Sequence, residues 1–187
     1  QPGERSFWEG EHPDLLLRDE AGGLVIDPDW GEVMLDVTTA AKRGALLTIV
    51  GGWIAGCADS GFDAVEIDNL DTYSRSGGRI SQQDAVDFMT ALSEAAHGVG
   101  LAIAQKNSAA VLDRRAEMGT DFAIVEECNL YRECVDFTAE YRDQVYVIEY
   151  DRSSFELGCS QHPDISIILR DVPLRTPSDS GYVYDGC

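Results

Sequence analysis

Strand-length runs rich in apolar residues alternate with longer stretches of helical periodicity along most of the chain. The strand-like runs lie at residues 33–37, 64–69, 101–104, 122–125, 145–148 and 165–169. Apolar positions at helical spacing occupy residues 38–58, 81–92, 109–118, 134–141 and 153–160 between them. Apolar strands separated by helices are typical of a parallel sheet with helical crossovers. The pattern therefore predicts an α/β fold.

Each predicted strand ends in polar residues. These terminal groups are Asp36, Asp68-Asn69, Lys106-Asn107, Glu126-Glu127, Glu149-Tyr150 and Arg170-Asp171. Because the carboxyl ends of parallel strands meet at one edge of a sheet, we expect these side chains to gather there.

A barrel of parallel strands accounts for this pattern better than an open sheet does. A doubly wound sheet would also gather its strand ends, but it usually carries a GxGxxG turn after its first strand, and the sequence has no such spacing. We therefore predict a (β/α)8 TIM-barrel-like fold with about six βα units present, so that two strands would precede residue 1. Residues 1–187 should form a single, partial barrel domain with an irregular lead-in at residues 1–32.

The lead-in contains a predicted hairpin. Apolar residues at 15–18 and 24–26 flank a polar, glycine-containing turn at residues 19–23. Trp8 and Trp30 could line a sugar-binding cleft, but packing beneath this hairpin is the interpretation that we favour. The tail after residue 171 is predicted to be a loop.

Charge restricts the classes of partner. Thirty-four acidic and fourteen basic residues give a formal net charge of −20 and a pI near 4.2. Such a surface repels nucleic-acid phosphates and anionic membranes, and it attracts cationic ligands. A generally acidic, solubilising surface is the alternative interpretation. No apolar run reaches membrane-spanning length, so we expect neither a nucleic-acid nor a membrane partner.

The five cysteines are Cys57, Cys128, Cys134, Cys159 and Cys187. None lies in a CxxC or a Cys/His zinc spacing, so no metal or cofactor is predicted. Cys128 and Cys134 bracket a short loop that suits a local disulfide. We predict an oxidising, extracellular setting for a secreted protein, with buried thiols in a cytosolic protein as the alternative.

Residues 61–73 carry the strongest chemical signal. Side chains alternate along a strand, so Ala64, Glu66 and Asp68 share one face. Two acids on one face of a largely buried strand are costly unless the end of the strand opens onto water or a ligand. The two acids are therefore either a solvated loop entry or part of a site at the carboxyl edge of the barrel.

Several motifs together resemble the endo-α-1,4-polygalactosaminidase family of glycoside hydrolases. They are GFDAVEIDNLD at 61–71, QKN at 105–107, FAIVEEC at 122–128 with Tyr131 and Glu133-Cys134, and IEY at 148–150. These motifs follow one another in the same order as in the family, and they extend over residues 30–172. The resemblance implies a (β/α)8 barrel whose strands three to eight are present, and endo-cleavage of α-1,4-linked galactosamine polysaccharide. The sequence departs from the family at Ile67, where proline is usual, and at Val125, where a polar residue is usual.

The resemblance also implies a catalytic pair of carboxylates, Asp68 from the fourth strand and Glu126 from the sixth. Glycoside hydrolysis requires two such groups on either side of the scissile bond. Asp68 is the predicted nucleophile and Glu126 the predicted acid/base, held protonated by apolar neighbours such as Val125 or Tyr131. We expect a separation of about 5–5.5 Å, which gives retention of configuration; about 6.5–9.5 Å would indicate inversion.

Other polar residues near the strand ends are predicted to bind substrate. They are Asp36, Glu66, Asn69, Asp71, Lys106, Asn107, Tyr131, Glu149 and Tyr150. For Glu66 we favour a salt bridge with Lys106, and Lys106 could keep a catalytic carboxylate ionised. The remaining acids either bind sugar amines or accept local hydrogen bonds, and the tyrosines either stack on sugar faces or pack.

The predicted partner is a cationic, galactosamine-containing polysaccharide, bound by a monomer. Two other functions stay open. One is a noncatalytic carbohydrate-binding domain or an inactive barrel fragment. The other is a metal-dependent barrel hydrolase with Asp36, Asp68 and Glu126 as oxygen ligands.

Overall fold

The computed structural model describes residues 2–187, which divide into two compact units. The first unit contains the residues up to Val65, Asn69–Ala102 and Ala116–Gly119. The second contains Glu66–Asp68, Ile103–Arg115 and Thr120–Cys187. Each unit has a hydrophobic core of its own.

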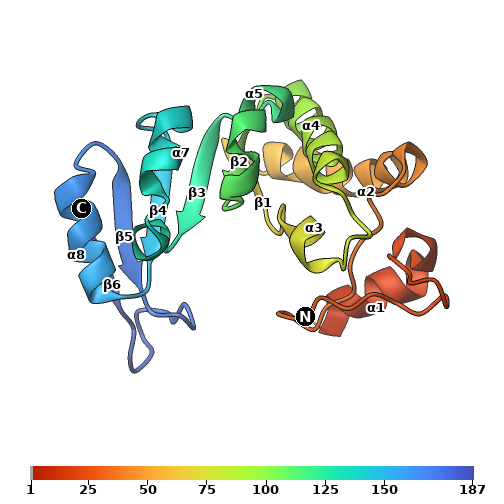
Figure 1. The fold of residues 1–187 in the computed structure, drawn as a ribbon, viewed down its shortest axis with the longest axis horizontal. Coiled ribbons are helices and arrows are strands. Elements are labelled where there is room, and N and C mark those ends of the chain that lie inside the picture. The colour runs from red at the N-terminus through yellow and green to blue at the C-terminus, as the bar shows by residue number, and fades with distance from the viewer. Residues whose placement is uncertain (1) are drawn as a thin grey trace. The chain divides into compact units, whose positions relative to one another are not determined.

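Six strands form one sheet in sequence order (Figure 1). They are β1 (Ala64–Ile67), β2 (Ala102–Lys106), β3 (Phe122–Glu126), β4 (Val145–Glu149), β5 (Ser166–Arg170) and β6 (Tyr184–Gly186). Strands β2 to β5 run parallel, and Val125 of β3 lies opposite Val147 of β4. Strand β6 pairs antiparallel with β5. The predicted α/β fold is confirmed.

Most of the longer helices lie where helical periodicity predicted them, but residues 2–11 form a helix in the lead-in, where the prediction of irregular structure was wrong. The helices are α1 (Pro2–Glu11), α2 (Ala40–Asp59), α3 (Thr72–Arg75), α4 (Gln82–Gly98), α5 (Arg115–Met118), α6 (Cys128–Tyr131), α7 (Cys134–Tyr141) and α8 (Arg152–Gln161), with 3-10 segments η1 (Pro13–Leu15) and η2 (Ala109–Arg114). Asp151 caps α8 through the backbone N–H of Ser154, and Ser81 with Asp84 forms a capping box at α4. The helix expected at 109–118 is instead a 3-10 segment followed by one helical turn.

Residues 33–37 do not form a strand of the sheet, and this prediction was wrong. The backbone N–H of Val25 donates to Leu17 (2.9 Å), that of Met34 to Val25 (3.0 Å), and that of Leu17 to Met34 (2.8 Å). The three stretches thus close into a ring of hydrogen bonds within the lead-in. An apolar run specifies an extended segment but does not specify its partner. The predicted hairpin is confirmed by the antiparallel bridge between Arg18 and Leu24.

The two tryptophans of the lead-in behave differently. Trp8 is 7% exposed and packs with Leu16, Leu17 and Met34 in the core of the first unit, as the hairpin interpretation predicted. Trp30 is 68% exposed, so the prediction that it packs beneath the hairpin was wrong.

The two faces of the sheet in the second unit differ in burial. Val125, Val147 and Leu169 are buried with side chains of α7 and α8, which lie beside β3 to β5 (Figure 1). Ile124 and Tyr146 project from the opposite face, where Tyr146 is 45% exposed. Because side chains alternate along a strand, Glu126 belongs to this second, more open face.

Two disulfides join segments of the second unit. Cys128 and Cys134 form the predicted local disulfide across α6. Cys159 of α8 pairs with Cys187, next to β6, where the sequence predicted a loop. Cys57 is a free cysteine.

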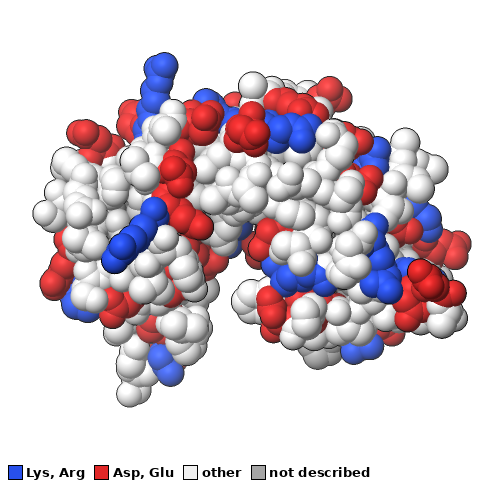
Figure 2. All heavy atoms as spheres, in the orientation of Figure 1, with Lys and Arg blue, Asp and Glu red and all other residues white. Residues whose placement is uncertain are grey.

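The surface is acidic, as the composition indicates. Acidic side chains are spread over the face shown in Figure 2. Within residues 2–187, no helix combines the length and the apolar character needed to cross a membrane.

Gly158 is required for α8 to approach α6, so we predict that Gly158→Ala destabilises the protein. A Cβ at this position would lie 2.3 Å from Nδ2 of Asn129, whose buried side chain is held by Glu149. We expect a loss of about 1–3 kcal/mol in the free energy of unfolding, measured by chemical denaturation. Gly52→Ala in α2 is the matched control, because nothing lies within 4 Å of its Cβ position. That change should stabilise the protein by about 0.5–1 kcal/mol. An unchanged stability for Gly158→Ala would contradict the packing described.

Candidate active site

One ammonium group lies among three carboxylates at the carboxyl ends of β1, β2 and β3. Lys106 Nζ is 3.3 Å from Glu66 Oε1, 3.3 Å from Asp68 Oδ1 and 3.2 Å from Glu126 Oε2. The Lys106 side chain is 11% exposed, whereas that of Asp68 is 63% exposed. The predicted salt bridge between Glu66 and Lys106 is therefore confirmed, and the same lysine brings Asp68 and Glu126 together.

Strand geometry explains why these side chains converge. Glu66 and Asp68 share one face of β1 and its extension, while Lys106 and Glu126 are the last residues of β2 and β3. Asn107 and Ser108 then take left-handed backbone conformations, with φ of 45° and 64°. This sharp exit from β2 places the Asn107 side chain against the end of β3.

Three side chains orient the Glu126 carboxylate. Asn107 Oδ1 accepts a hydrogen bond from the Glu126 backbone N–H (2.8 Å), and Asn107 Nδ2 donates to Glu126 Oε2 (3.3 Å). The Tyr150 hydroxyl donates to Glu126 Oε1. Together with the ion pair to Lys106, these contacts occupy both oxygens of Glu126 and fix its direction.

These contacts shift the pKa values of Glu126, Lys106 and Tyr150. Burial opposes ionisation of Glu126, but the Tyr150 hydrogen bond, the charge of Lys106 and Asn107 hold the pKa of Glu126 below its ordinary value. Burial likewise opposes the Lys106 charge, yet Asp68, Glu66 and Glu126 raise the pKa of Lys106. Burial and the Glu126 carboxylate raise the pKa of Tyr150, which therefore stays a hydrogen-bond donor.

The prediction that apolar neighbours keep Glu126 protonated was therefore wrong. Val125 is 1% exposed and packs in the core behind the strand, and Tyr131 is 64% exposed on α6. The hydrogen bond from Tyr150 and the charge of Lys106 favour the carboxylate form of Glu126 in the free protein. With Glu66 and Asp68 also counted, the cluster holds more negative than positive charge, and it should attract a cation.

The distances to Lys106 set an upper limit on the separation of the two predicted catalytic carboxyl groups. Asp68 Oδ1 and Glu126 Oε2 are each within 3.3 Å of Nζ, so these two oxygens lie at most about 6.5 Å apart. Retaining glycosidases separate their carboxyl groups by about 5–5.5 Å and inverting ones by about 6.5–9.5 Å. The limit includes the separation of the retaining arrangement and reaches the lower end of the inverting range.

Glu149 does not belong to this cluster, which corrects the prediction that it binds substrate. It is fully buried, on the face of β4 that carries Val147. Its Oε1 accepts hydrogen bonds from the backbone and side chain of Asn129 (2.9 and 3.0 Å), and burial raises the pKa of Glu149. The Glu149 carboxyl group at the end of β4 therefore anchors α6 through Asn129. Its grouping with Cys128 and Cys134 offers no thiolates to a metal, because the two cysteines form a disulfide.

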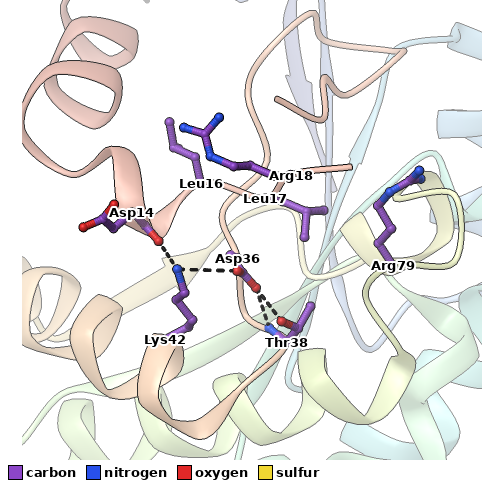
Figure 3. Close-up of a pocket in the computed structure, with 8 residues that line it drawn as sticks. All are labelled: Asp14, Leu16, Leu17, Arg18, Asp36, Thr38, Lys42 and Arg79. Atoms are coloured by element: carbon purple, nitrogen blue, oxygen red, sulfur yellow. Dashed lines mark hydrogen bonds and ion pairs between the residues drawn. The ribbon is translucent and has the colours of Figure 1, made fainter. Parts of the chain in front are cut away.

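Asp36 lies in the first unit, where it lines a cavity of about 510 Å³ (Figure 3). Its Oδ1 accepts hydrogen bonds from the backbone and hydroxyl of Thr38 (3.1 and 2.6 Å), and Lys42 Nζ lies 3.7 Å from Oδ2. The rest of the lining is Asp14, Leu16, Leu17, Arg18 and Arg79. Asp36 therefore accepts local hydrogen bonds, one of the two roles that the sequence left open.

Asn69 and Asp71 also belong to the first unit, where Arg75 binds both. Arg75 donates to Asp71 Oδ2 (2.6 Å), to Asn69 Oδ1 (3.2 Å) and to Asp27 Oδ2 (2.9 Å). The sequence reasoning missed Arg75 and Asp27. The spacing of Asp71 and Arg75, four residues apart, was the one available signal.

Comparison with known proteins identifies relatives. The sequence pattern of glycoside-hydrolase family GH114 matches residues 3–187. The crystal structure of Aspergillus fumigatus Ega3 in complex with galactosamine superposes with a TM-score of 0.75 at 22% identity, covering 99% of this chain and 74% of that chain. The glycoside hydrolase domain of PelA from Pseudomonas aeruginosa superposes with a TM-score of 0.60 at 12% identity, covering 95% of this chain and 75% of that chain. No curated protein matches by sequence. The structural matches confirm the TIM-barrel-like fold.

The hydrogen bond from Tyr150 predicts the direction in which Tyr150→Phe shifts the titration of Glu126. Removing this donor takes away one contact that favours the carboxylate, so the pKa of Glu126 should rise. Carboxyl-carbon NMR across a pH titration measures the shift, with Glu126→Gln to assign the signal. Tyr131→Phe, on an exposed tyrosine, is the control and should leave the titration unchanged. A Glu126 pKa that stays constant or falls in Tyr150→Phe would show that the hydroxyl does not stabilise the carboxylate.

Proposed function

The chain belongs to glycoside-hydrolase family GH114, and on this basis we propose that it is an endo-acting glycosidase that cleaves α-1,4-linked galactosamine polysaccharide. The observation that carries the proposal is the pairing of Asp68 and Glu126 by Lys106. Two carboxyl groups at this separation, one open to solvent and one held in a fixed direction, are what a retaining glycosidase requires.

The proposed mechanism assigns one step to each carboxyl group. The Asp68 carboxylate attacks the anomeric carbon while Glu126 gives its proton to the departing glycosidic oxygen. Water then attacks the same carbon, Glu126 takes a proton from it, and Asp68 leaves as a carboxylate. The ammonium of Lys106 lies 3.3 Å from Asp68 Oδ1 and holds this carboxylate in place for the attack.

Glu126 must bind a proton before the first step. Because its pKa lies below the ordinary value in the free protein, few molecules carry this proton at neutral pH. Acidic solutions should therefore favour cleavage, and the rate should fall as the pH rises above the pKa of Glu126.

Charge supports an amine-bearing substrate. Glu66, Asp68 and Glu126 surround one lysine, and the whole chain carries a net charge of −20. A polymer of galactosamine with free amines is cationic and would be attracted, whereas uronic-acid polymers would be repelled. The solved relative Ega3 was crystallised with galactosamine, which agrees with this choice.

The two disulfides support an extracellular site of action. Cys128–Cys134 and Cys159–Cys187 would persist in an oxidising environment and would be reduced in most cytosols. A secreted enzyme also meets a polysaccharide that is too large to enter a cell.

Removing either catalytic carboxylate should abolish cleavage. We expect Asp68→Asn and Glu126→Gln each to lower kcat on de-N-acetylated galactosamine polymer by about 10³-fold, measured as release of reducing ends. The same changes at exposed acids, Asp143→Asn and Glu156→Gln, are the matched controls and should leave kcat unchanged. Full activity in either catalytic variant would exclude the proposed mechanism. Binding of the polymer by the wild-type protein without any cleavage would instead favour the noncatalytic alternative.

The anomer of the first product tests the nucleophilic role of Asp68. The proposed mechanism is a double displacement, which the limit of about 6.5 Å on the separation from Glu126 allows, so the new reducing end should form as the α-anomer. Proton NMR during the first minutes of cleavage distinguishes the anomers before they equilibrate. Initial formation of the β-anomer would assign Asp68 to activating water rather than to attacking the sugar.

A further inference from the structure

A polar network lies inside the core of the second unit, behind the strand ends that carry the site. Gln105 comes directly before Lys106 in β2, and its fully buried side chain lies on the opposite face of the strand, in register with the core residue Ala123. Tyr141 at the end of α7 and Thr120 are also buried. Burying an amide and two hydroxyl groups is costly unless each of them forms hydrogen bonds.

The hydrogen bonds of this network have a defined direction. The Thr120 and Tyr141 hydroxyl groups lie 2.5 Å apart, and the Tyr141 hydroxyl donates to Gln105 Oε1 (2.7 Å). Because a phenol has a single proton, Thr120 is the donor to Tyr141. Burial raises the pKa of Tyr141 to about 12, so this hydroxyl keeps its proton. The Gln105 amide is therefore oriented with its oxygen toward Tyr141.

The nitrogen of the same amide holds the turn that leaves β2. Gln105 Nε2 donates to the backbone carbonyl of Asn107 (2.8 Å) and to that of Ser108 (3.2 Å). Both residues take left-handed backbone conformations, which are unfavourable for most residues that have a side chain. The two hydrogen bonds supply a buried donor to both carbonyl groups, so they favour this turn over a relaxed one.

Asn107 connects this turn to the proposed acid/base. Its Oδ1 accepts a hydrogen bond from the Glu126 backbone N–H, and its Nδ2 donates to Glu126 Oε2. The conformations open to a side chain depend on the φ and ψ of its own residue. A relaxed turn would therefore move the Asn107 amide away from both contacts with Glu126.

The far end of the network is fixed by Arg115. Its guanidinium group lies over the Tyr141 ring, 4.5 Å from the centroid. Its Nη1 donates to the Glu140 carbonyl (2.7 Å) and its Nε to the Thr120 carbonyl (3.3 Å). Apolar residues of similar size could fill this part of the core, but only a connected set of hydrogen bonds specifies one arrangement of the Gln105 amide.

We propose that Gln105 and Tyr141 are positioning residues for Glu126, which keep Asn107 in the backbone conformation from which it binds and orients the carboxyl group. This inference rests on the proposed function and deepens it. Gln105 and Tyr141 act from the core and leave the sugar to the groups at the strand ends. Their substitution should therefore change kcat and its pH dependence more than KM.

Gln105→Met tests this role, because methionine fills a similar volume but cannot donate to the two carbonyl groups. Asn107 should lose its contact with the Glu126 carboxylate, so the pKa of Glu126, measured by carboxyl-carbon NMR, should rise. At the optimum pH, kcat on de-N-acetylated galactosamine polymer should fall about tenfold with KM within about twofold, and the optimum should move to higher pH. Tyr141→Phe leaves the Gln105 amide in place, so it should produce smaller changes in the same directions.

Phe137→Leu and Tyr146→Phe are the matched controls. Phe137 is fully buried on α7 in the same core, so Phe137→Leu should lower Tm without changing the Glu126 pKa or the optimum pH. Tyr146 is half-exposed in β4, so Tyr146→Phe removes a tyrosine hydroxyl outside the network and should change neither quantity.

A double-mutant cycle distinguishes an effect through Asn107 from a general loosening of the core. Asn107→Ala should itself raise the Glu126 pKa, and adding Gln105→Met to it should raise that pKa no further. An equal additional rise in the double variant would overturn the inference, because Gln105 would then act on Glu126 by another route.

The remaining outcomes separate this inference from the proposed function. An unchanged Glu126 pKa in folded Gln105→Met would overturn the inference even if Asp68→Asn abolishes cleavage. If Gln105→Met does not fold, Tyr141→Phe decides, since a raised Glu126 pKa supports the positioning role and an unchanged one overturns it. If the wild-type protein cleaves nothing, the proposed function fails, while the expected pKa changes would still support the positioning of Glu126.

Discussion

The site depends on the burial of a single ammonium group. Lys106 is largely removed from water, and burying a lone charge in this way would cost several kcal/mol. Ion pairs with Glu66, Asp68 and Glu126 offset that cost, and in turn the lysine makes it possible for three carboxylates to lie together. Each group is tolerable only because the others are present. Losing the lysine would leave three like charges at the ends of β1 and β3, and they would repel one another.

The cluster around Lys106 affects two properties that a glycosidase needs of Glu126. They are the direction of its carboxyl group and the protonation of that group. Lys106, Asn107 and Tyr150 fix the direction of Glu126, but all three donate hydrogen bonds and so favour its ionised form. A general acid must hold a proton at the moment of cleavage. Binding of a cationic sugar near Asp68 would compete with Lys106 for the carboxylates and weaken its hold on Glu126. In the proposed mechanism, the free protein therefore presents Glu126 in the form of the base that completes the reaction, and the proton for the first step must come from the solvent.

Most of the fold and part of the candidate site could be predicted from the sequence. Apolar runs and helical spacing indicated five of the six strands and most helices, because burial imposes those periods on the chain. Two-residue alternation placed Glu66 on the same face as Asp68, where a salt bridge with Lys106 was the favoured role. The same rule, continued from Val145 through Val147, would have placed Glu149 on the buried face. Residues 33–37 were misassigned because an apolar run carries no information about which segment it pairs with, and only the folded lead-in supplies Leu17 and Val25 as partners.

The orientation of the residues beyond the strand ends could not be predicted, because the alternation stops there. Asp68, Lys106 and Glu126 are each followed by a non-glycine residue in the left-handed region, with φ of 61° at Asn69, 45° at Asn107 and 59° at Glu127. Asparagine tolerates this conformation, but glutamate rarely adopts it, and each such residue costs on the order of 1 kcal/mol or more. The chain accepts this strain at three consecutive strand ends. A sharp left-handed exit stops the strand directly after the charged residue, so the side chain stays at the edge of the sheet and the following loop turns away from it. The disulfide of Cys128 and Cys134, which closes the loop directly after Glu127, holds the least favourable of the three exits in place.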